Sequence, residues 1–236
     1  MAILEVNDVT SGYGDVQILW GASLKLEPGL MTCLVGANGV GKTTLLRTVM
    51  GQLRPWSGSV RFEGHEISRL PAHRRAELGL VLVPEGRQLF GDMTVRENLD
   101  LGATNRRAHR YRERNLERVF AMFPRLKHRS TQKANTMSGG EQQMLAVGRG
   151  IMAEPTVLLI DELSLGLAPV LVIQLFENLQ SLKDLGITIM LVEQNVQMSL
   201  AVCDYGYVLA QGRIEIEGES AALIKDDHVR AAYMGL

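Results

Sequence analysis

Short apolar runs, separated by glycine, proline and polar residues, dominate both ends of this chain. Near the start they predict strands over 3–6, 16–19, 23–26 and 31–35, with a Gly-Tyr-Gly turn at 12–14, then a helix over 42–50, a strand over 59–62, a helix over 71–77 and a strand over 80–83. After residue 153 the pattern predicts strands over 157–160, 187–192, 205–209 and 213–216, helices over 170–185 and 196–202, a turn at 211–212 and a short helical tail. This alternation predicts an α/β fold with a parallel sheet.

The middle of the chain, residues 86–153, has a different pattern and contains no convincing strand. Thr94 and Glu97 have the spacing of a capping box, which favours a helix over 95–101. Apolar side chains then recur at helical spacing, at Tyr111, Leu116, Val119, Phe120 and Phe123. We therefore expect a single domain over 1–236, in which a helical subdomain over 86–153 is inserted into a core formed by 1–85 and 154–236.

The composition is that of a folded soluble protein, with 236 residues of which 46% are hydrophobic and 22% are charged. No apolar run approaches the roughly 18 residues that a membrane-spanning helix needs. The N-terminus lacks the pattern of a signal peptide, so we expect a cytoplasmic location. Cys33 and Cys203 lie in apolar patterns and are interpreted as reduced core residues.

The formal net charge of -1 conceals two unlike regions. Residues 101–133 contain ten Arg and Lys against two Glu, which leaves an excess of acidic residues over the remainder of the chain. The favoured interpretation is a solvated, arginine-rich helix face. Contact with acidic lipid headgroups or with a partner's cytoplasmic loop comes next, and contact with RNA or DNA comes last.

A phosphate-binding loop is indicated by the pattern G-x-x-x-x-G-K-[ST], which lies between a predicted strand and a predicted helix. Its residues are Gly36, Ala37, Asn38, Gly39, Val40, Gly41, Lys42 and Thr43. Glycines let backbone N–H groups surround a phosphate, while Lys42 offers a charge to the β- and γ-phosphates and Thr43 a hydroxyl to Mg²⁺. A glycine-rich turn with a chance lysine is the alternative. The loop predicts binding of a nucleoside triphosphate.

Two acidic residues follow the apolar strand over 157–160. Beside a phosphate loop, Asp161 is expected to hold Mg²⁺, directly or through water. Glu162 would point toward the γ-phosphate, where a carboxylate can accept a proton from the attacking water, and it is the candidate general base. The alternative is that both acids only end the strand and open a turn.

A third motif, Ser138-Gly139-Gly140, precedes an apolar helical pattern. Ser138 and Glu141 form a capping box, which is a sufficient structural reason for the serine. Two glycines in the first turn of a helix cost about 1 kcal/mol each relative to alanine. The two glycines are explained if an anionic ligand must approach this backbone closely, because a side chain there would block it.

With these motifs in this order, the chain resembles the ATP-binding subunits of ABC transporters over essentially all of its 236 residues. The resemblance implies an α/β fold, namely a P-loop NTPase (ABC ATPase) core with an antiparallel β subdomain and an inserted α-helical subdomain. It also implies that Tyr13 stacks on adenine. Residues Gly36 to Thr44 would form the Walker A loop, and Asp161 and Glu162 the Walker B pair.

The same resemblance assigns roles at the contact with a second nucleotide-binding subunit. Ser138, Gly139 and Gly140 would contact the γ-phosphate bound by that subunit. Residues 164–167 would be the D-loop at the interface between the two subunits. Without the resemblance, Tyr13 would be interpreted as a packing aromatic in a turn.

Two positions depart from the general pattern of the family. Glu85 stands where a glutamine normally contacts Mg²⁺ and senses the membrane partner, and Gln194 stands where a histidine normally contacts the γ-phosphate. The carboxylate of Glu85 still offers oxygen to Mg²⁺ and the amide of Gln194 still donates to phosphate, but neither can titrate as histidine does. Leu163 departs instead from the narrower subgroup that these two positions resemble, which usually has proline there, and this predicts slightly looser positioning of Glu162.

These departures resemble one subgroup, the second ATPase subunit of branched-chain (hydrophobic) amino acid importers; the ATPase of urea and short-amide importers is the near alternative. The resemblance implies ATP and Mg²⁺ as cofactors, with Lys42, Glu162 and Gln194 in catalysis and Thr43, Glu85 and Asp161 at the metal. The implied partners are a second ATPase subunit, identical or paralogous, transmembrane permease subunits and, indirectly, a periplasmic or extracellular solute-binding protein. The protein would lie on the inner face of the cell membrane.

Two functions from other classes remain as alternatives. A soluble ABC ATPase acting on ribosomes or DNA is supported only by the basic segment, because the chain has one phosphate loop and no sustained heptads. A P-loop kinase or G protein has no need for Ser138-Gly139-Gly140 at a helix start. We therefore expect no nucleic-acid partner.

Overall fold

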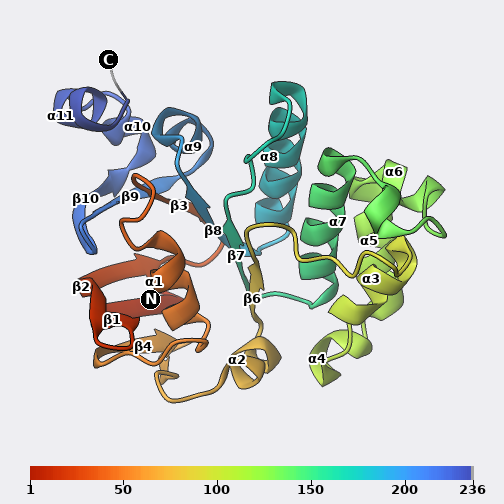
Figure 1. Cartoon of the computed structure of the whole chain (residues 1–236), viewed down its shortest axis with the longest axis horizontal. Coiled ribbons are helices and arrows are strands. Elements are labelled where there is room, and N and C mark those ends of the chain that lie inside the picture. Colours follow the sequence, from red (N-terminus) through yellow and green to blue (C-terminus); the bar gives the residue numbers. More distant parts are fainter. Residues whose placement is uncertain (235–236) are drawn as a thin grey trace.

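The computed structural model describes residues 1–234 and consists of two β-sheets with helices between and beside them (Figure 1). The larger sheet has the strand order β10-β9-β3-β8-β7-β6, and the smaller one has the order β2-β1-β4-β5. In Figure 1 the small sheet lies at one end of the molecule and a group of helices lies at the other. The predicted mixed α/β fold is confirmed.

The larger sheet is parallel except at one edge. Its strands are β3 (Met31–Val35), β6 (Leu80–Val83), β7 (Val157–Asp161), β8 (Thr188–Glu193), β9 (Tyr205–Ala210) and β10 (Arg213–Glu219). The pairs β3–β8, β3–β9, β7–β8 and β6–β7 are parallel, and β10 pairs antiparallel with β9 through the predicted turn at Gln211 and Gly212. The carboxyl ends of β3, β7 and β8 therefore lie along one edge.

The smaller sheet corrects the predicted elements in the first 30 residues. It contains β1 (Leu4–Tyr13), β2 (Val16–Leu26), β4 (Ser57–Phe62) and β5 (His65–Glu66), all antiparallel. The predicted turn at 12–14 is wrong, because Gly12 pairs with Gln17 inside the ladder and the chain reverses at Gly14 and Asp15. The two short strands predicted over 16–19 and 23–26 are one strand, bent at an irregularity opposite Asp8 and Val9.

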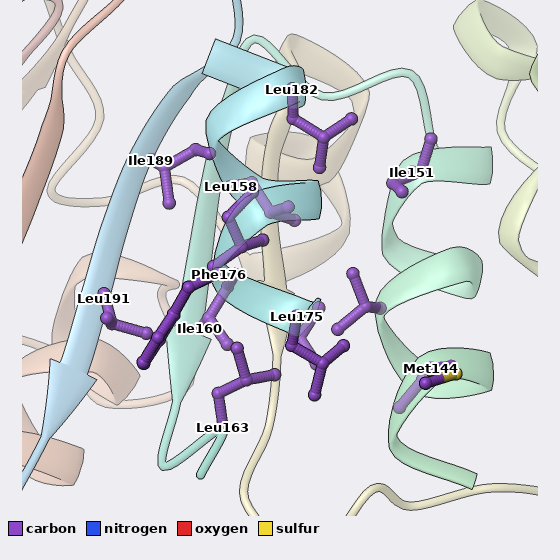
Figure 2. Close-up of a cluster of buried hydrophobic side chains, with 14 of the residues drawn as sticks. Met144, Ile151, Leu158, Ile160, Leu163, Leu175, Phe176, Leu182, Ile189 and Leu191 are labelled. Carbon is purple, nitrogen blue, oxygen red and sulfur yellow. The ribbon is translucent and has the colours of Figure 1, made fainter. Parts of the chain in front are cut away.

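Two hydrophobic cores lie on opposite faces of the larger sheet. The first is enclosed by the small sheet and α1 (Lys42–Val49), whose Leu45, Leu46 and Val49 are fully buried. The second lies under α7 (Gly139–Met152), α8 (Pro169–Asp184) and α9 (Val196–Val202). Figure 2 shows side chains of this core, among them Ile151 of α7, Leu175 of α8 and Leu158 of β7, gathered among these two helices and the strands. The alternating strand residues that face these two cores fix the sheet between them.

The inserted segment is helical. It contains α3 (Val95–Gly102), α4 (Arg106–His109), α5 (Arg112–Met122), α6 (Pro124–His128), a 3₁₀ turn (Ala134–Thr136) and α7. The predicted capping box of Thr94 and Glu97 is present. Within 86–153 the described pairing is a single bridge between Thr94 and Lys133. The remaining helices are α2 (Ala72–Leu78), α10 (Ser220–Leu223), α11 (Asp227–Val229) and a π-helical turn (Arg230–Met234).

Part of the basic segment pairs with the chain itself. Arg112 contacts Asp100 at 2.7 Å and Arg114 contacts Glu154 at 2.6 Å. Arg107 donates to the carbonyl oxygen of Leu78 at 2.8 Å, and Arg129 lies 3.2 Å from Glu141. These arginines join the inserted helices to one another and to the core, so they are not simply a solvated face.

Cys33 and Cys203 are both free thiols buried in the second core, as predicted. A hydrogen bond with the neighbouring Cys33 thiol, together with burial, raises the pKa of Cys203 well above its ordinary value. Of the helices in residues 1–234, none has the length and apolar character that crossing a membrane requires.

Arg75 is a buried cation that closes the end of α1. Its guanidinium donates to the carbonyl oxygens of Thr48 and Val49 in the last turn of α1, at 2.9 and 2.6 Å, and to those of Ser68 and Leu70. The side chain is 1% exposed, and burial lowers its pKa to about 10. Carbonyls at a helix C-terminus lack helical partners and attract positive charge, so Arg75 satisfies them.

We predict that Arg75→Met lowers the free energy of unfolding by about 3 kcal/mol or more, because several buried carbonyls lose a charged donor at once. Urea denaturation measures the change. Arg74→Met is the matched control, since Arg74 is exposed and pairs only with Glu77, and an exposed pair contributes about 0.5 kcal/mol. Equal effects of the two substitutions would contradict this role for Arg75.

Candidate functional site

The phosphate loop lies at the carboxyl end of β3 and leads directly into α1. Gly41, the N-cap of α1, has φ 112°, a conformation that favours glycine. The loop is tied to the β9–β10 turn, because the N–H of Gly212 donates to the carbonyl oxygen of Val40 at 3.0 Å. The predicted strand–loop–helix arrangement is therefore present, with backbone N–H groups at the start of α1 free to receive an anion.

Gly36 is held against the main chain of β9. A Cβ atom at this position would lie 2.2 Å from the carbonyl oxygen of Leu209. Because that oxygen belongs to a strand of the sheet, it cannot move aside as a side chain would. Glycine at position 36 thus fixes how closely the loop packs on the sheet.

Lys42 is buried beneath the loop. Its Nζ donates to the carbonyl oxygens of Gly36 and Ala37 at 2.8 and 3.1 Å, and it lies 3.9 Å from Oε1 of Glu162. The side chain is only 5% exposed. The ammonium is therefore positioned between the loop that would receive phosphates and the candidate general base.

A cavity of about 300 Å³ collects residues from distant parts of the sequence around this loop. It is lined by Asn38, Gly39, Gly41, Lys42, Thr43 and Thr44 of the loop and by Ile18, Glu85 and Glu162. A larger neighbouring cleft, of about 870 Å³, is lined in part by Thr43, Glu85 and Asp161. The structure therefore brings the predicted metal ligands together at the edge of the phosphate loop.

Asp161, the last residue of β7, carries a buried carboxyl group with an oxygen that could bind a cation. It is 3% exposed, and its Oδ1 has no hydrogen-bond partner within the described residues. Burial raises its pKa to about 6, and the neighbouring Thr43 hydroxyl opposes this only in part. An unpartnered buried carboxylate oxygen beside a hydroxyl and a second carboxylate is a set of hard oxygen donors, which suits Mg²⁺.

The described residues contain no group of three or more His, Cys, Asp and Glu side chains that could hold a metal ion without other ligands. A Mg²⁺ ion here would depend on the oxygens of Asp161, Thr43 and Glu85 together with phosphate and water. That dependence is ordinary for Mg²⁺, which keeps several waters and is commonly shared with substrate phosphates.

Glu162 leaves the sheet in an unusual backbone conformation. Its φ is 48°, and its N–H donates to the carbonyl oxygen of Val192 on β8 at 2.9 Å. Glu162 and Gln194, which follows β8, both line a cavity of about 540 Å³. The structure therefore brings together the two side chains that the sequence places near the γ-phosphate.

Glu193 is a residue of this site that the sequence analysis missed. Its carboxylate accepts hydrogen bonds from the N–H and from the hydroxyl of Ser164, at 2.9 and 2.8 Å. Glu193 therefore joins the end of β8 to the segment after Glu162. Burial, with a contribution from the charge of Glu162, raises the pKa of Glu193. The only signal in the sequence was an acidic residue at the end of an apolar run.

Leu163, the position where proline is usual, is held by its side chain in the second core, and the looser positioning of Glu162 stays a prediction. The side chain is fully buried, and Figure 2 shows it beneath β7 and beside Leu175 of α8. The leucine therefore anchors the residue next to Glu162 in the second core.

Ser138 is the N-cap of α7, and the predicted capping box with Glu141 is complete. Burial opposes ionisation of Glu141, but hydrogen bonds from Ser138 and the charge of Arg129 lower its pKa overall. Ser138, Gly139 and Gly140 line none of the three cavities described above. The described chain thus does not bring this motif into its own phosphate site.

The two glycines of this motif have neighbours within the chain. A Cβ atom on Gly140 would lie 2.4 Å from Cδ1 of Leu171 on α8, and one on Gly139 would lie 3.1 Å from Nη2 of Arg87. Other groups therefore do come close to the backbone of both glycines, but these groups are side chains of the protein itself. The sequence analysis assigned it to a ligand alone and missed Arg87 and Leu171.

Tyr13 lies at the end of β1, with 41% of its surface exposed. Its hydroxyl accepts from Nη1 of Arg47 on α1 at 3.0 Å, and the Arg47 guanidinium lies 6.0 Å from the ring centroid. Among the described residues, Tyr13 lines none of the three cavities named above. Its ring faces α1 from the side of the small sheet.

Comparisons with known proteins agree with these motifs. The sequence model of the family described as ABC transporter matches residues 19–164. The chain is 44% identical to the high-affinity branched-chain amino acid transport ATP-binding protein BraG of Pseudomonas aeruginosa, over 99% of this chain and 100% of BraG. It is 34% identical to the probable branched-chain amino acid transport ATP-binding protein LivF of Archaeoglobus fulgidus, over 99% of each chain. The solved ADP conformation of an ATP-binding cassette of an ABC transporter has a TM-score of 0.84 and 29% identity, and the match covers 100% of both chains.

We predict that Gly36→Ala lowers the free energy of unfolding by about 2 kcal/mol, because the added methyl group collides with the main chain of β9. Gly39→Ala is the matched control, since Gly39 has φ 80° and no atom within 4 Å of its Cβ position. It should cost about 1 kcal/mol from backbone strain alone. Urea denaturation of the nucleotide-free protein measures both, and an equal or smaller loss for Gly36→Ala would contradict the packing argument.

Proposed function

Because this chain belongs to the ABC transporter family, we propose that it is the ATP-hydrolysing subunit of an importer for branched-chain amino acids. The observation that carries this proposal is the combination of full-length similarity to BraG with a phosphate loop and acidic pair at one sheet edge. ATP hydrolysis follows from the family. The transported substrate follows from the similarity to BraG and LivF.

Binding of the nucleotide is the task of the phosphate loop. The N–H groups of residues 36 to 44 surround the phosphates, and Lys42 places its charge at the β- and γ-phosphates. In the described structure the Lys42 ammonium donates to Gly36 and Ala37 carbonyls, so phosphate oxygens would replace these acceptors. Tyr13 would stack on the adenine after its ring turns from Arg47.

Thr43, Glu85 and Asp161 are the proposed ligands of Mg²⁺. The buried and unpartnered Oδ1 of Asp161 supports this assignment, because a cation would satisfy it. A Mg²⁺ ion held by these three residues would supply positive charge that stabilises the charge developing on the phosphates during hydrolysis.

Glu162 is the proposed general base. Its left-handed backbone and its hydrogen bond to Val192 direct the carboxylate into the cavity that it shares with Gln194. There it would orient the attacking water and accept a proton from it. The amide of Gln194 would donate to the γ-phosphate and stabilise its charge.

A second ATPase subunit, identical or paralogous, would complete each site. Ser138, Gly139 and Gly140 stand outside the cavities of their own chain, which supports a role in holding the γ-phosphate bound by the partner. Residues 164–167 would lie at the interface as the D-loop. Closing and reopening of the two subunits would be passed to transmembrane permease subunits through the loop after Glu85 and the helical subdomain over 86–153.

This function places the protein in the cytoplasm, on the inner face of the cell membrane. Its contact there is with permease subunits, and a solute-binding protein outside the membrane takes part only indirectly. The arginines that pair with Asp100, Glu154 and Glu141 stabilise the subdomain that would face the permease.

We predict that Glu162→Gln lowers the ATPase turnover number about 100-fold or more, because the water loses its base. Binding of ATP and Mg²⁺ should persist, since the phosphate loop and Asp161 are unchanged. Turnover of purified protein and the dissociation constant of a fluorescent ATP analogue measure the two effects. Glu117→Gln, on the surface of α5, is the control. Wild-type turnover of Glu162→Gln would refute the assignment of the base.

The substrate is tested by uptake in a strain that lacks this gene. We expect the deletion to reduce uptake of labelled leucine and to leave uptake of urea unchanged. The wild-type gene should restore leucine uptake, whereas the Glu162→Gln gene should not. Loss of urea uptake instead would favour the urea and short-amide importer. Unchanged uptake of both, with ATP-dependent binding to ribosomes or DNA, would favour the soluble ABC ATPase.

A further inference from the structure

We propose that Arg87 is a positioning residue that couples the two nucleotide-binding surfaces of this chain. On one side of it is Glu85, a proposed ligand of Mg²⁺ at the chain's own phosphate loop. On the other is the start of α7, where Ser138 and Gly139 would receive the γ-phosphate held by a second subunit. The inference rests on the proposed function and extends it.

The guanidinium of Arg87 is bonded to the beginning of α7. Its Nη1 donates to Oε1 of Gln142 at 2.8 Å, and its Nε donates to Oε1 of Gln143 at 3.3 Å. In the opposite direction, Nη2 of Arg149 on α7 donates to the carbonyl oxygen of Arg87 at 3.2 Å. The loop that follows β6 and crosses toward the helical end of the molecule in Figure 1 is thus joined to α7 by side-chain and main-chain atoms of one residue.

The backbone at this point is held in a strained form. Arg87 and Gln88 have φ values of 63° and 44°, and two successive non-glycine residues seldom adopt this conformation. Strain of this kind persists where surrounding contacts enforce it, and it gathers at functional segments. Here the N–H of Gln88 donates to the carbonyl oxygen of Gly86 at 2.6 Å, and the contacts of Arg87 with α7 hold this turn from outside.

Gly139 permits the approach of the guanidinium. A Cβ atom on Gly139 would lie 3.1 Å from Nη2 of Arg87 and 3.4 Å from Nη1. Among residues 1–234, Nη2 donates to no protein atom. The guanidinium therefore lies over the backbone of the motif Ser138-Gly139-Gly140, and the N–H groups of its Nη2 remain available as donors.

Stabilisation of α7 alone is a poor account of this arrangement. A cation at a helix N-terminus is repelled by the positive end of the helix dipole. The capping box of Ser138 and Glu141 already satisfies the first turn. Arg87 nevertheless lies there, on a strained loop and two residues from Glu85. A role in passing a movement of this loop to α7 explains its presence.

The consequence is a physical link between two nucleotides. A shift of Glu85 on binding Mg²⁺ and ATP would be passed by the rigid, planar guanidinium of Arg87 to Gln142 and Gln143. The first turn of α7 then takes the geometry that the partner's γ-phosphate requires. Each chain would thus present its motif to the partner's nucleotide most favourably when its own nucleotide is in place.

The test compares Arg87→Met with Arg110→Met, an exposed arginine of the inserted segment. We expect Arg87→Met to lower the ATPase turnover number about tenfold while the dissociation constant for Mg²⁺ and ATP stays within twofold and the Tm stays within a few degrees. Arg87→Lys should not restore turnover, because an ammonium cannot donate in a planar fork to both glutamines. A parallel loss of ATP affinity, Tm and turnover would show a merely structural role and overturn the proposal.

Gln142 supplies a matched pair of variants. Gln142→Glu and Gln142→Leu both lose the bond from Nε2 to the carbonyl oxygen of Ala134, but only Gln142→Glu keeps an acceptor for Arg87. Turnover should remain near wild type in Gln142→Glu and fall as far as in Arg87→Met in Gln142→Leu. The double variant Arg87→Met/Gln142→Leu should be no worse than either single variant, and additive losses would overturn the link.

Hydrogen exchange separates this inference from the proposed function, because it needs neither hydrolysis nor transport. Amides of residues 138–144 are followed in the isolated chain with and without Mg²⁺ and ATP. We expect the nucleotide to slow exchange severalfold in wild type and Arg110→Met, and to leave it unchanged in Arg87→Met. An unresponsive wild type, or an unaltered response in Arg87→Met, would overturn the coupling. Failure of leucine uptake alone would overturn only the transported substrate.

Discussion

The parallel pairing of β3 with β8, and of β8 with β7, is the constraint on which the site depends. In this register Val35 pairs with Glu193 and Asp161 pairs with Val192, so three strand ends stop at the same edge. The phosphate loop, Glu162 and Gln194 are the next residues along these strands, and Asp161 is the last residue of β7. Apolar side chains buried on both faces of the sheet hold the register, because a slip of one residue would exchange the two faces.

Charged groups of both signs lie close together at this edge of the sheet. Lys42 is the buried cation, Asp161 is the buried acid without a partner, and Glu162 lies within ion-pair distance of Lys42. Glu193 adds a second buried acid, whose carboxylate accepts hydrogen bonds from the N–H and the hydroxyl of Ser164. A site with more carboxyl groups than cations is suited to take up Mg²⁺ together with a nucleotide.

Several arginines in this structure link one element of the fold to another through hydrogen bonds and ion pairs. Arg75 closes the end of α1, and Arg112 and Arg114 join inserted helices to acidic groups of their neighbours. Arg87 joins the loop after β6 to α7. The excess positive charge of residues 101–133 is therefore partly used inside the molecule, which net charge by itself does not reveal.

The sequence alone predicts the α/β fold, the inserted helices, the phosphate loop, the acidic pair and the capping boxes, because each depends on residues close together in the chain. It misplaced the first turn, since strand pairing carries Gly12 into the ladder. Only the tertiary structure decided that Leu163 is an anchor, that Glu193 holds Ser164, and that Arg87 and Leu171 lie against the two glycines of α7. The contacts of Glu193 with Ser164, of Leu171 with Gly140 and of Arg87 with Gly139 join residues 29, 31 and 52 positions apart, and a local pattern carries no information about which distant side chain fills a given space.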